Sequence, residues 1–261
     1  MTSNEGVTMI DYTEAEIIET RTVSWFSCGA ASAVATKLTN PDIIAYCHTG
    51  SEDVDNARFM KDCIEWWGKE VTVLKNSKYQ DTWQVFESRR YLSGIDGAPC
   101  TKALKIEPRL AFQQKGDVHI FGYTYDNRDR QRADTLREHY PELDIRTPLI
   151  DKKLTKAACL HIIKQASINP PRVYALGFPN ANCIPCVKAT SPKYWALVRK
   201  SYPIEFQRMA KLSRDLGVRL TRLKGERVFI DEIPDNYPTF GALAPECDFL
   251  CQIVEQDLEK G

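Results

Sequence analysis

The sequence predicts an α/β fold in which helices flank a twisted parallel sheet. Apolar runs of strand length alternate with segments of helical periodicity. The strand-like runs cover 22–27, 42–50, 71–76 and 117–124, and the helical segments cover 31–38 and 57–68. Strands that alternate with helices favour parallel pairing, because each helix returns the chain to the beginning of the next strand.

The runs appear in an order that places turns at the ends of the strands. TVSWFS passes into the helical ASAVATKL, and DIIAYCHTG ends in a Thr-Gly turn. VTVLKN supplies a third strand, and DVHIFGYT supplies a fourth that ends at a glycine. Ligands of such sheets bind beyond the carboxyl ends of the strands, so we expect the loops at Ser27, His48 and Gly122 to share one site.

The chain divides into three expected regions: an N-terminal extension (1–20), an α/β domain (21–180) and a cysteine-bearing, mostly helical C-terminal region (181–261). Within the last, a helical run is expected over 193–216 and a short hairpin around LTRLKGERVFI. Aromatic residues interleave with cations here, which could face a nucleic acid. An amphipathic helix is the preferred interpretation, with a core stripe of Tyr194, Trp195, Leu197 and Val198.

Composition narrows the function classes without naming one. Of the 261 residues, 43% are hydrophobic, enough for a sizeable core. The 35 basic and 35 acidic residues cancel, so no global cationic field favours nucleic acids or membranes. The sequence contains neither a signal pattern nor an apolar run long enough to span a bilayer. We expect a cytoplasmic protein without membrane association, and a homo-oligomer stays open.

The turn in FSCGAASAV is a candidate anion site. Ser27, Gly29 and Ser32 place hydroxyls and an unobstructed backbone at the start of a helix, where free amides and the helix dipole favour negative charge. The alternative is a closely packed turn in which Ser27 or Ser32 caps the helix. No Gly-Lys-Ser/Thr follows, so the turn is not a Walker loop.

Eight of the nine cysteines form two groups. Cys183 and Cys186 in NCIPCV are spaced so that both thiolates reach one metal ion, and zinc and an iron–sulfur cluster both suit such ligands. Three further cysteines in turn-like settings complete the candidate set: Cys100, Cys247 and Cys251. Three others lie in helical or strand patterns and are expected to be small buried core residues: Cys47, Cys63 and Cys159.

The order of five segments resembles the phosphoadenylylsulfate (PAPS) and adenylylsulfate (APS) reductases, within the adenine nucleotide alpha hydrolases. The segments are FSCGAASAVATKL at the position of the family's modified PP-loop, YCHTGSEDVDNARFM, CTKALKIEPRLAF, FGYTYDNRDRQRAD and NPPRVYALGFPNANCIPC. The resemblance spans roughly Val23 to Cys186 and implies that 21–180 is a PP-loop-like nucleotide-binding domain. The chain departs from the family at His48, which replaces an aspartate, and at Thr101, which replaces one of two paired cysteines.

The resemblance implies a set of site residues. Cys100, Cys183 and Cys186 would ligate a [4Fe-4S] cluster beside an adenine nucleotide. Cys251 or Cys247 would supply the fourth ligand, or the fourth iron would stay open. Lys105 would lie between cluster and phosphates, and the nucleotide-binding set would be Ser27, Gly29, Ser32, Thr49, Gly50, Lys105, Gly122 and Arg128.

Three functions follow as expectations. In the first, Cys247 attacks the sulfur of APS or PAPS and a thioredoxin-like partner releases sulfite. Ala30 and Ala31 favour it, because they stand where ATP-splitting relatives carry basic and acidic groups. The alternatives are ATP-dependent, cluster-assisted sulfur transfer to a nucleic acid, and a degenerate nucleotide-binding module with structural zinc.

Overall fold

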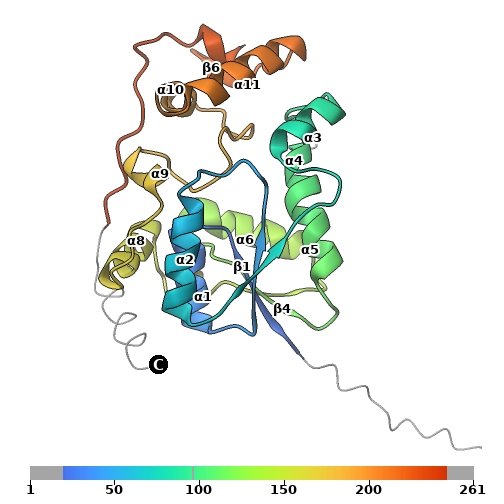
Figure 1. Cartoon of the computed structure of the whole chain (residues 1–261), viewed down its shortest axis with the longest axis vertical. Coiled ribbons are helices and arrows are strands. Elements are labelled where there is room, and N and C mark those ends of the chain that lie inside the picture. The colour runs from blue at the N-terminus through green and yellow to red at the C-terminus, as the bar shows by residue number, and fades with distance from the viewer. Residues whose placement is uncertain (1–19, 96, 246–261) are drawn as a thin grey trace, which may run out of the picture.

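The computed structural model describes residues 20–95 and 97–245, and its centre is a five-stranded sheet (Figure 1). All strand pairs of this sheet are parallel, in the order β3-β2-β1-β4-β5. The strands are β1 (Thr22–Phe26), β2 (Ile43–Cys47), β3 (Val71–Leu74), β4 (Val118–Ile120) and β5 (Asp144–Arg146). The α/β class and the four strands expected from the sequence are confirmed, and β5 was not foreseen.

Strand β1 lies at the centre of the sheet, and its residues from Val23 to Phe26 are buried on both faces. It pairs with β2, with Trp25 opposite Ala45, and with β4, with Ser24 opposite Ile120. Its polar residue Ser24 is buried, and its hydroxyl lies 2.7 Å from that of Thr36 on the helix that follows. That bond satisfies two buried hydroxyls and fixes the helix against the strand.

Four helices cover one face of the sheet: α1 (Ala30–Thr39), α2 (Asn56–Trp67), α7 (Pro148–Asp151) and α8 (Lys156–Gln165). Helix α1 packs against α8, α7 and α2, and its small side chains bring it close to the strands. The core beneath them includes Phe26, Phe59 and Ile163, all almost inaccessible to solvent.

The opposite face is covered more thinly. Helix α5 (Glu107–Phe112) sets Phe112 edge-on against Trp25 of β1, with ring centroids 6.3 Å apart. The chain reaches α5 through α3 (Thr82–Arg89), the short α4 (Pro99–Thr101) and a π-helical turn, η1 (Lys102–Ile106). Helix α6 (Asn127–His139) buries only Ala133, so it belongs mostly to the surface.

A second core lies beyond the carboxyl edge of the sheet, toward the top of Figure 1. Its elements are α10 (Pro192–Ser201), α11 (Pro203–Asp215), the antiparallel hairpin β6 (Thr221–Leu223) and β7 (Glu226–Val228), and η2 (Ile230–Glu232). Trp195 and Phe206 pack there with Trp83 and Phe86 of α3. This core is therefore built from both halves of the chain.

The C-terminal predictions hold with one correction. Tyr194, Trp195, Leu197 and Val198 form the buried stripe that the sequence predicts, and the hairpin is present. The single helix expected over 193–216 is two helices that meet at Tyr202, because Pro203 lacks the amide that would continue α10 and begins a new helix.

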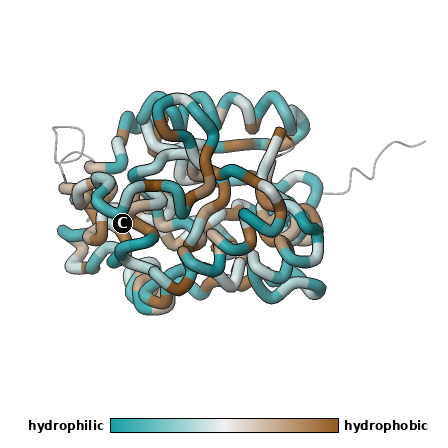
Figure 2. The backbone as a smooth tube through the Cα atoms, turned by 90° about the horizontal axis from the view of Figure 1, so that it is seen from above, coloured by the Kyte–Doolittle hydropathy of each residue, from teal (hydrophilic) through white to brown (hydrophobic). Residues whose placement is uncertain are grey.

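The hydropathy of the residues follows this layering. Seen from above, most segments at the periphery of the molecule are hydrophilic, and many segments in its interior are hydrophobic (Figure 2). Among the residues that the structure describes, none of the helices combines the length and apolar character needed to cross a bilayer.

Candidate functional site

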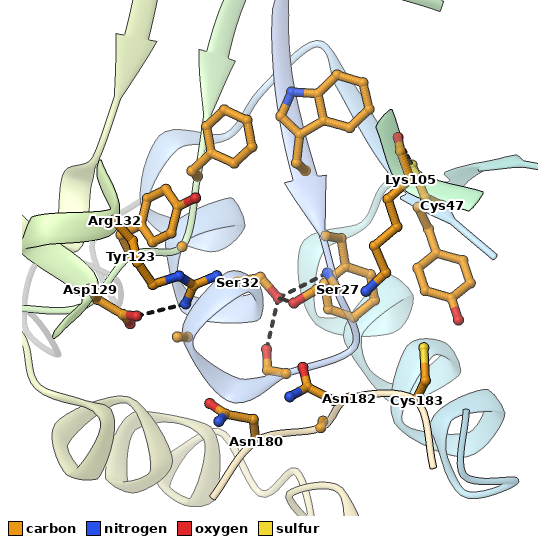
Figure 3. Close-up of a pocket in the computed structure, with 18 of the residues that line it drawn as sticks. Ser27, Ser32, Cys47, Lys105, Tyr123, Asp129, Arg132, Asn180, Asn182 and Cys183 are labelled. Carbon is orange, nitrogen blue, oxygen red and sulfur yellow. Dashed lines mark hydrogen bonds and ion pairs between the residues drawn. The ribbon is translucent and has the colours of Figure 1, made fainter. Parts of the chain in front are cut away.

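A cavity of about 310 Å³ opens at the carboxyl ends of β1, β2 and β4 (Figure 3). Strand β1 is the middle strand of the sheet. After β1 the chain forms β2 on one side of it, and only later forms β4 on the other side. This is the topological switch point where parallel sheets bind ligands. Ser27 and Gly122 line the cavity, and His48 contacts Glu52 in its wall at 3.8 Å. The three loops therefore converge as predicted.

The turn before α1 forms the floor of the cavity. The Ser32 hydroxyl donates to the Gly29 carbonyl at 3.0 Å and accepts from the Ser27 amide at 3.1 Å. Both serine hydroxyls are thus held within the turn and lie 3.1 Å apart. The N-cap residue Gly29 has no side chain to cap α1, and the Ala30 amide donates to the Tyr174 hydroxyl at 3.4 Å. The opening turn of α1, including Ala31 and Ser32, lines the cavity, so the positive end of the helix is available to an anion.

Cys28 completes this turn in a way that the sequence did not reveal. Its φ of 54° lies in the left-handed region, which is unfavourable for a residue with a Cβ. Its side chain is inaccessible to solvent, and burial raises the pKa of the thiol far above its ordinary value. Cys28 is therefore a neutral packing residue beneath the turn.

One wall of the cavity carries thiols, a lysine and a carboxylate. Burial, together with Cys183 and Cys186, raises the pKa of the Cys100 thiol to about 11. Burial lowers the pKa of the Lys105 amine, but the neighbouring Cys183 and Glu52 raise it above its usual value. Lys105 stays a cation and reaches from η1 into the cavity (Figure 3).

Glu52 is ionised in this wall. Its Oε1 accepts from the Thr49 amide at 2.8 Å and from the Thr49 hydroxyl at 2.6 Å, and Oε2 accepts from the Ser51 amide at 3.1 Å. Burial raises the pKa of Glu52, but these hydrogen bonds hold it below the usual range. The same Thr49 hydroxyl lies 2.9 Å from the Cys183 sulfur, so carboxylate and thiol are joined through one side chain.

The predicted metal ligands are only partly assembled. Cys100, Cys183 and Cys186 are half-buried and close enough to affect one another's charge, which suits the chemistry of a thiolate-bound metal. Within 20–95 and 97–245, however, no three His, Cys, Asp or Glu side chains are arranged to hold a metal ion. Cys247 and Cys251 lie outside the described residues.

The facing wall supplies further cations. Asp129 accepts from Arg132 at 2.9 Å and from the Thr124 hydroxyl at 2.9 Å, which fixes Arg132 at the rim of the cavity (Figure 3). The Lys156 amine donates to the Pro179 carbonyl at 2.9 Å, and burial lowers its pKa. The predicted Arg128 is exposed and does not line the cavity; Arg132 lies there instead, one helical turn further on.

The other predicted residues differ in their placement. Ser27, Gly29, Ser32, Lys105 and Gly122 all line the cavity. Thr49 lies behind it, against Cys183. Gly50 has a φ of +65°, and a Cβ there would lie 2.1 Å from the Gln80 carbonyl, so this glycine allows two loops to touch.

Among the predicted core cysteines, two are correct and one is not. Cys63 and Cys159 are inaccessible to solvent. Cys47 is half-buried and lines the cavity, because it is the last residue of β2, and its thiol lies 3.6 Å from the Lys105 carbonyl. The position at a strand end, where parallel sheets bind ligands, was the signal that separates it from the other two.

Several lining residues were missed, among them Glu52, Arg109, Lys156, Tyr174, Asn180 and Asn182. Glu52 had a usable signal, because it follows Thr49 by three residues, the spacing at which a carboxylate reaches back to a backbone amide. The others lie on elements distant in sequence, and only the tertiary fold brings them to the cavity.

The site thus combines a helix start, cations from four elements and a thiol-bearing wall around one cavity. Such a combination suits an anionic small molecule of nucleotide size. A scan of protein-family models and searches of curated proteins and of solved structures find no match to this chain.

Proposed function

We propose that the cavity binds an adenine nucleotide and that the protein is a cytoplasmic APS or PAPS reductase-like oxidoreductase of the adenine nucleotide alpha hydrolase type. The observation that carries the proposal is that the start of α1, with Ser27 and Ser32, lies in one cavity with Lys105 and Cys183. The helix start suits the phosphate, and the thiol wall stands beside it.

The carboxylates of the cavity favour a nucleotide that is already activated. Glu52 is engaged by Thr49, and Asp129 is engaged by Arg132 and Thr124. Neither is left to hold the Mg²⁺ that cleavage of ATP between its α- and β-phosphates would need. Ala31 adds no carboxylate to the turn.

In the proposed reaction, the Cys247 thiolate attacks the sulfur of APS or PAPS. The new S–S bond forms as the bond from sulfur to the phosphate oxygen breaks, and AMP or its 3′-phosphate leaves. A thioredoxin-like dithiol then reduces the cysteine thiosulfonate, which releases sulfite and leaves a disulfide on the partner. Cys247 lies outside the described residues, so its role rests on the family resemblance.

Cys100, Cys183 and Cys186 would hold the proposed [4Fe-4S] cluster, with Cys251 as a fourth ligand. A bound cluster would supply an iron–sulfide centre whose field acts on the anionic end of the nucleotide. Because burial raises the pKa of the Cys100 and Cys183 thiols and keeps both protonated at neutral pH, metal binding would release protons.

Metal content and turnover test the proposal together. Protein purified without oxygen is assayed for iron and zinc, then offered APS or PAPS with thioredoxin while sulfite is measured. We expect iron and sulfite. Cys247→Ser should lose sulfite and keep iron, Cys186→Ser should lose iron, and Cys63→Ala is the matched control with both retained. Zinc without iron would contradict the proposal and support the nucleotide-binding module with structural zinc.

The β6–β7 hairpin favours a second candidate, sulfur transfer to a nucleic acid. Arg222 and Arg227 are exposed and stand directly opposite each other across the two strands. Like charges at this position destabilise a hairpin, and neither arginine forms an ion pair with a carboxylate of the described residues. A phosphate backbone would compensate the pair.

Binding and ATP cleavage separate the two candidates. A labelled tRNA and a labelled DNA duplex are titrated at several salt concentrations, and pyrophosphate release from ATP is measured with each. For the second candidate, Arg222→Gln with Arg227→Gln should lower the salt slope by about 2. Lys200→Gln with Lys211→Gln, also exposed, is the control. If neither nucleic acid binds and no pyrophosphate is released, the second candidate function is excluded.

A further inference from the structure

Arg109 is a buried cation without a counter-ion in the wall of the cavity. Only 7% of the residue is exposed, yet it lines the cavity. Its Nε and Nη2 are buried and have no hydrogen-bond partner, and no described carboxylate pairs with it. A buried guanidinium in this state is costly, so its presence calls for an acceptor that the folded chain itself does not supply.

The groups around Arg109 do not neutralise it. Its guanidinium lies over the Tyr140 ring, 4.7 Å from the centroid. His119 nearby is kept neutral because burial lowers its pKa, and its Nδ1 accepts from the Trp25 indole at 3.1 Å. The Gln113 side-chain oxygen, directly after the end of α5, is unpaired but neutral. None of these groups carries the negative charge that a guanidinium requires.

Arg109 and the start of α1 reach the cavity from opposite faces of the sheet. Helix α1 packs into the core on one face, and α5, which carries Arg109, packs against Trp25 on the other. Trp25, Phe121 and Tyr123 form a row on the α5 side, with near-parallel neighbouring rings 6.4 and 5.8 Å apart. All three line the cavity, so a planar group has an aromatic surface there.

We infer that Arg109 forms a second anion subsite, and that the ligand of this cavity carries two separate anionic groups, one at the start of α1 and one at Arg109. The inference rests on the proposed function and narrows its substrate class to a nucleotide with a phosphate or sulfate at a second position. The planar guanidinium suits two oxygens of such a group at once.

The first test uses inorganic sulfate alone. Thermal unfolding is followed in sulfate and in chloride at equal ionic strength, for the full chain and for Arg109→Met. Sulfate should raise the midpoint of the natural protein more than chloride does, and Arg109→Met should reduce the difference to the part that the start of α1 contributes. Arg109→Met should also unfold at a higher temperature than the natural protein without sulfate, because the unpaired charge is gone. An arginine that only supported the fold would give the opposite shift.

The second test compares AMP with adenosine 3′,5′-bisphosphate by calorimetry. The bisphosphate should bind about tenfold more tightly or better, since one charge-assisted contact is added. Arg109→Met should lose that preference while its AMP affinity changes less than about twofold. Arg109→Lys, which keeps the charge without the planar fork, should retain part of the preference, and Arg146→Met, exposed on β5, should retain all of it.

The outcomes separate the subsite from the proposed function. Equal affinity for the two nucleotides, together with no sulfate effect that depends on Arg109, would overturn the subsite and leave AMP binding in place. An Arg109-dependent sulfate effect without nucleotide binding would keep the subsite and overturn the proposed function. Loss of affinity for both nucleotides in Arg109→Met to the same extent would make Arg109 a general support of the cavity and also overturn the inference.

Discussion

Gly122 decides how closely β4 approaches the start of α1. A Cβ at this position would lie 2.6 Å from the Ser32 Cα and 2.7 Å from the Ser32 amide nitrogen, both backbone atoms. Real contacts do not reach such distances, so any larger residue must separate the strand end from the turn. The close packing of the strand end against the turn before α1 therefore requires a glycine here.

Gly122→Ala should destabilise the protein by about 1–3 kcal/mol. It should also weaken AMP binding more than tenfold, because Ser32 and the first amides of α1 would no longer point at the same position in the cavity. Urea unfolding and calorimetry measure the two effects. Gly241→Ala is the matched control, since an added Cβ there meets nothing within 4 Å. Unchanged AMP affinity in Gly122→Ala would show that the turn does not hold the phosphate.

Single residues were predictable where the chemistry is local. Ser27, Gly29 and Ser32 could be assigned because one turn contains all three. Arg109 could not be assigned, since its unpaired state depends on what α6 and β4 place around it. Cys47 was misjudged because its apolar strand pattern was given more weight than its position at the carboxyl end of β2, where it lines the cavity.

The loop after β2 is held to the C-terminal elements by a buried carboxylate. Asp53 accepts from Arg172 Nε at 2.8 Å and Nη2 at 2.9 Å, and from the Tyr202 hydroxyl. Arg172 begins α9 (Arg172–Ala175), and Tyr202 joins α10 to α11. The loop that carries Glu52 is thereby fixed against elements more than a hundred residues away.

Asp53→Asn should lower the free energy of unfolding at pH 7 by about 2 kcal/mol, as expected for lost charge-assisted hydrogen bonds. Burial raises the pKa of Asp53, but Arg172 and Tyr202 hold it below its usual value. The stabilisation is therefore present above the unfolded pKa of about 4 and is lost as pH falls through the lower folded value.

Urea unfolding of both proteins between pH 7 and pH 2 checks this dependence. The difference in the free energy of unfolding between the natural protein and Asp53→Asn should be constant near neutral pH and should disappear in acid. Asp134→Asn, at an exposed pair with Arg137, should cost less than about 0.5 kcal/mol. A gap that stays unchanged down to pH 2 would mean that the Asp53 charge does not stabilise the loop.

Elements were predictable in proportion to their apolar pattern. β1 and β2 are runs buried on both faces, and their limits were close to those found. β5 has three residues, of which only Ile145 is buried, and α6 buries only Ala133, so neither leaves a periodic signal. Pro203 interrupts α10–α11 without changing the apolar stripe, which explains why one helix was expected.

The two cores of the molecule are joined around the cavity. Ala181 packs against both, and the contacts of Asp53 cross from one to the other. Residues of β1, η1, α6 and the 180–183 segment all line the cavity, so a ligand that filled it would contact each of them. Ligand binding should therefore stabilise both cores and not only the sheet.

AMP at a hundred times its dissociation constant should stabilise the protein by about 2.7 kcal/mol. For a chain of this size, that corresponds to a rise of about 5–10 °C in the unfolding midpoint. Both cores should unfold in a single transition. Tryptophan fluorescence can follow both, because Trp25 lies in the sheet and Trp195 lies in the C-terminal core. Adenosine without phosphate is the control and should give a clearly smaller rise. Two transitions, with only one shifted, would mean that the cores unfold separately.

The position of β1 at the centre of the sheet also governs how the chain folds. Its ion pair beside β4, between Arg21 and Asp117, closes a separation of 96 residues. As the chain leaves the ribosome, β1 can therefore pair at first only with β2. Its other edge stays unpaired until β4 has been made, more than seventy residues later. We expect refolding to be slow for a protein of this size, with a rate set by loop closure, and the waiting edge of β1 to be the surface through which incomplete chains aggregate.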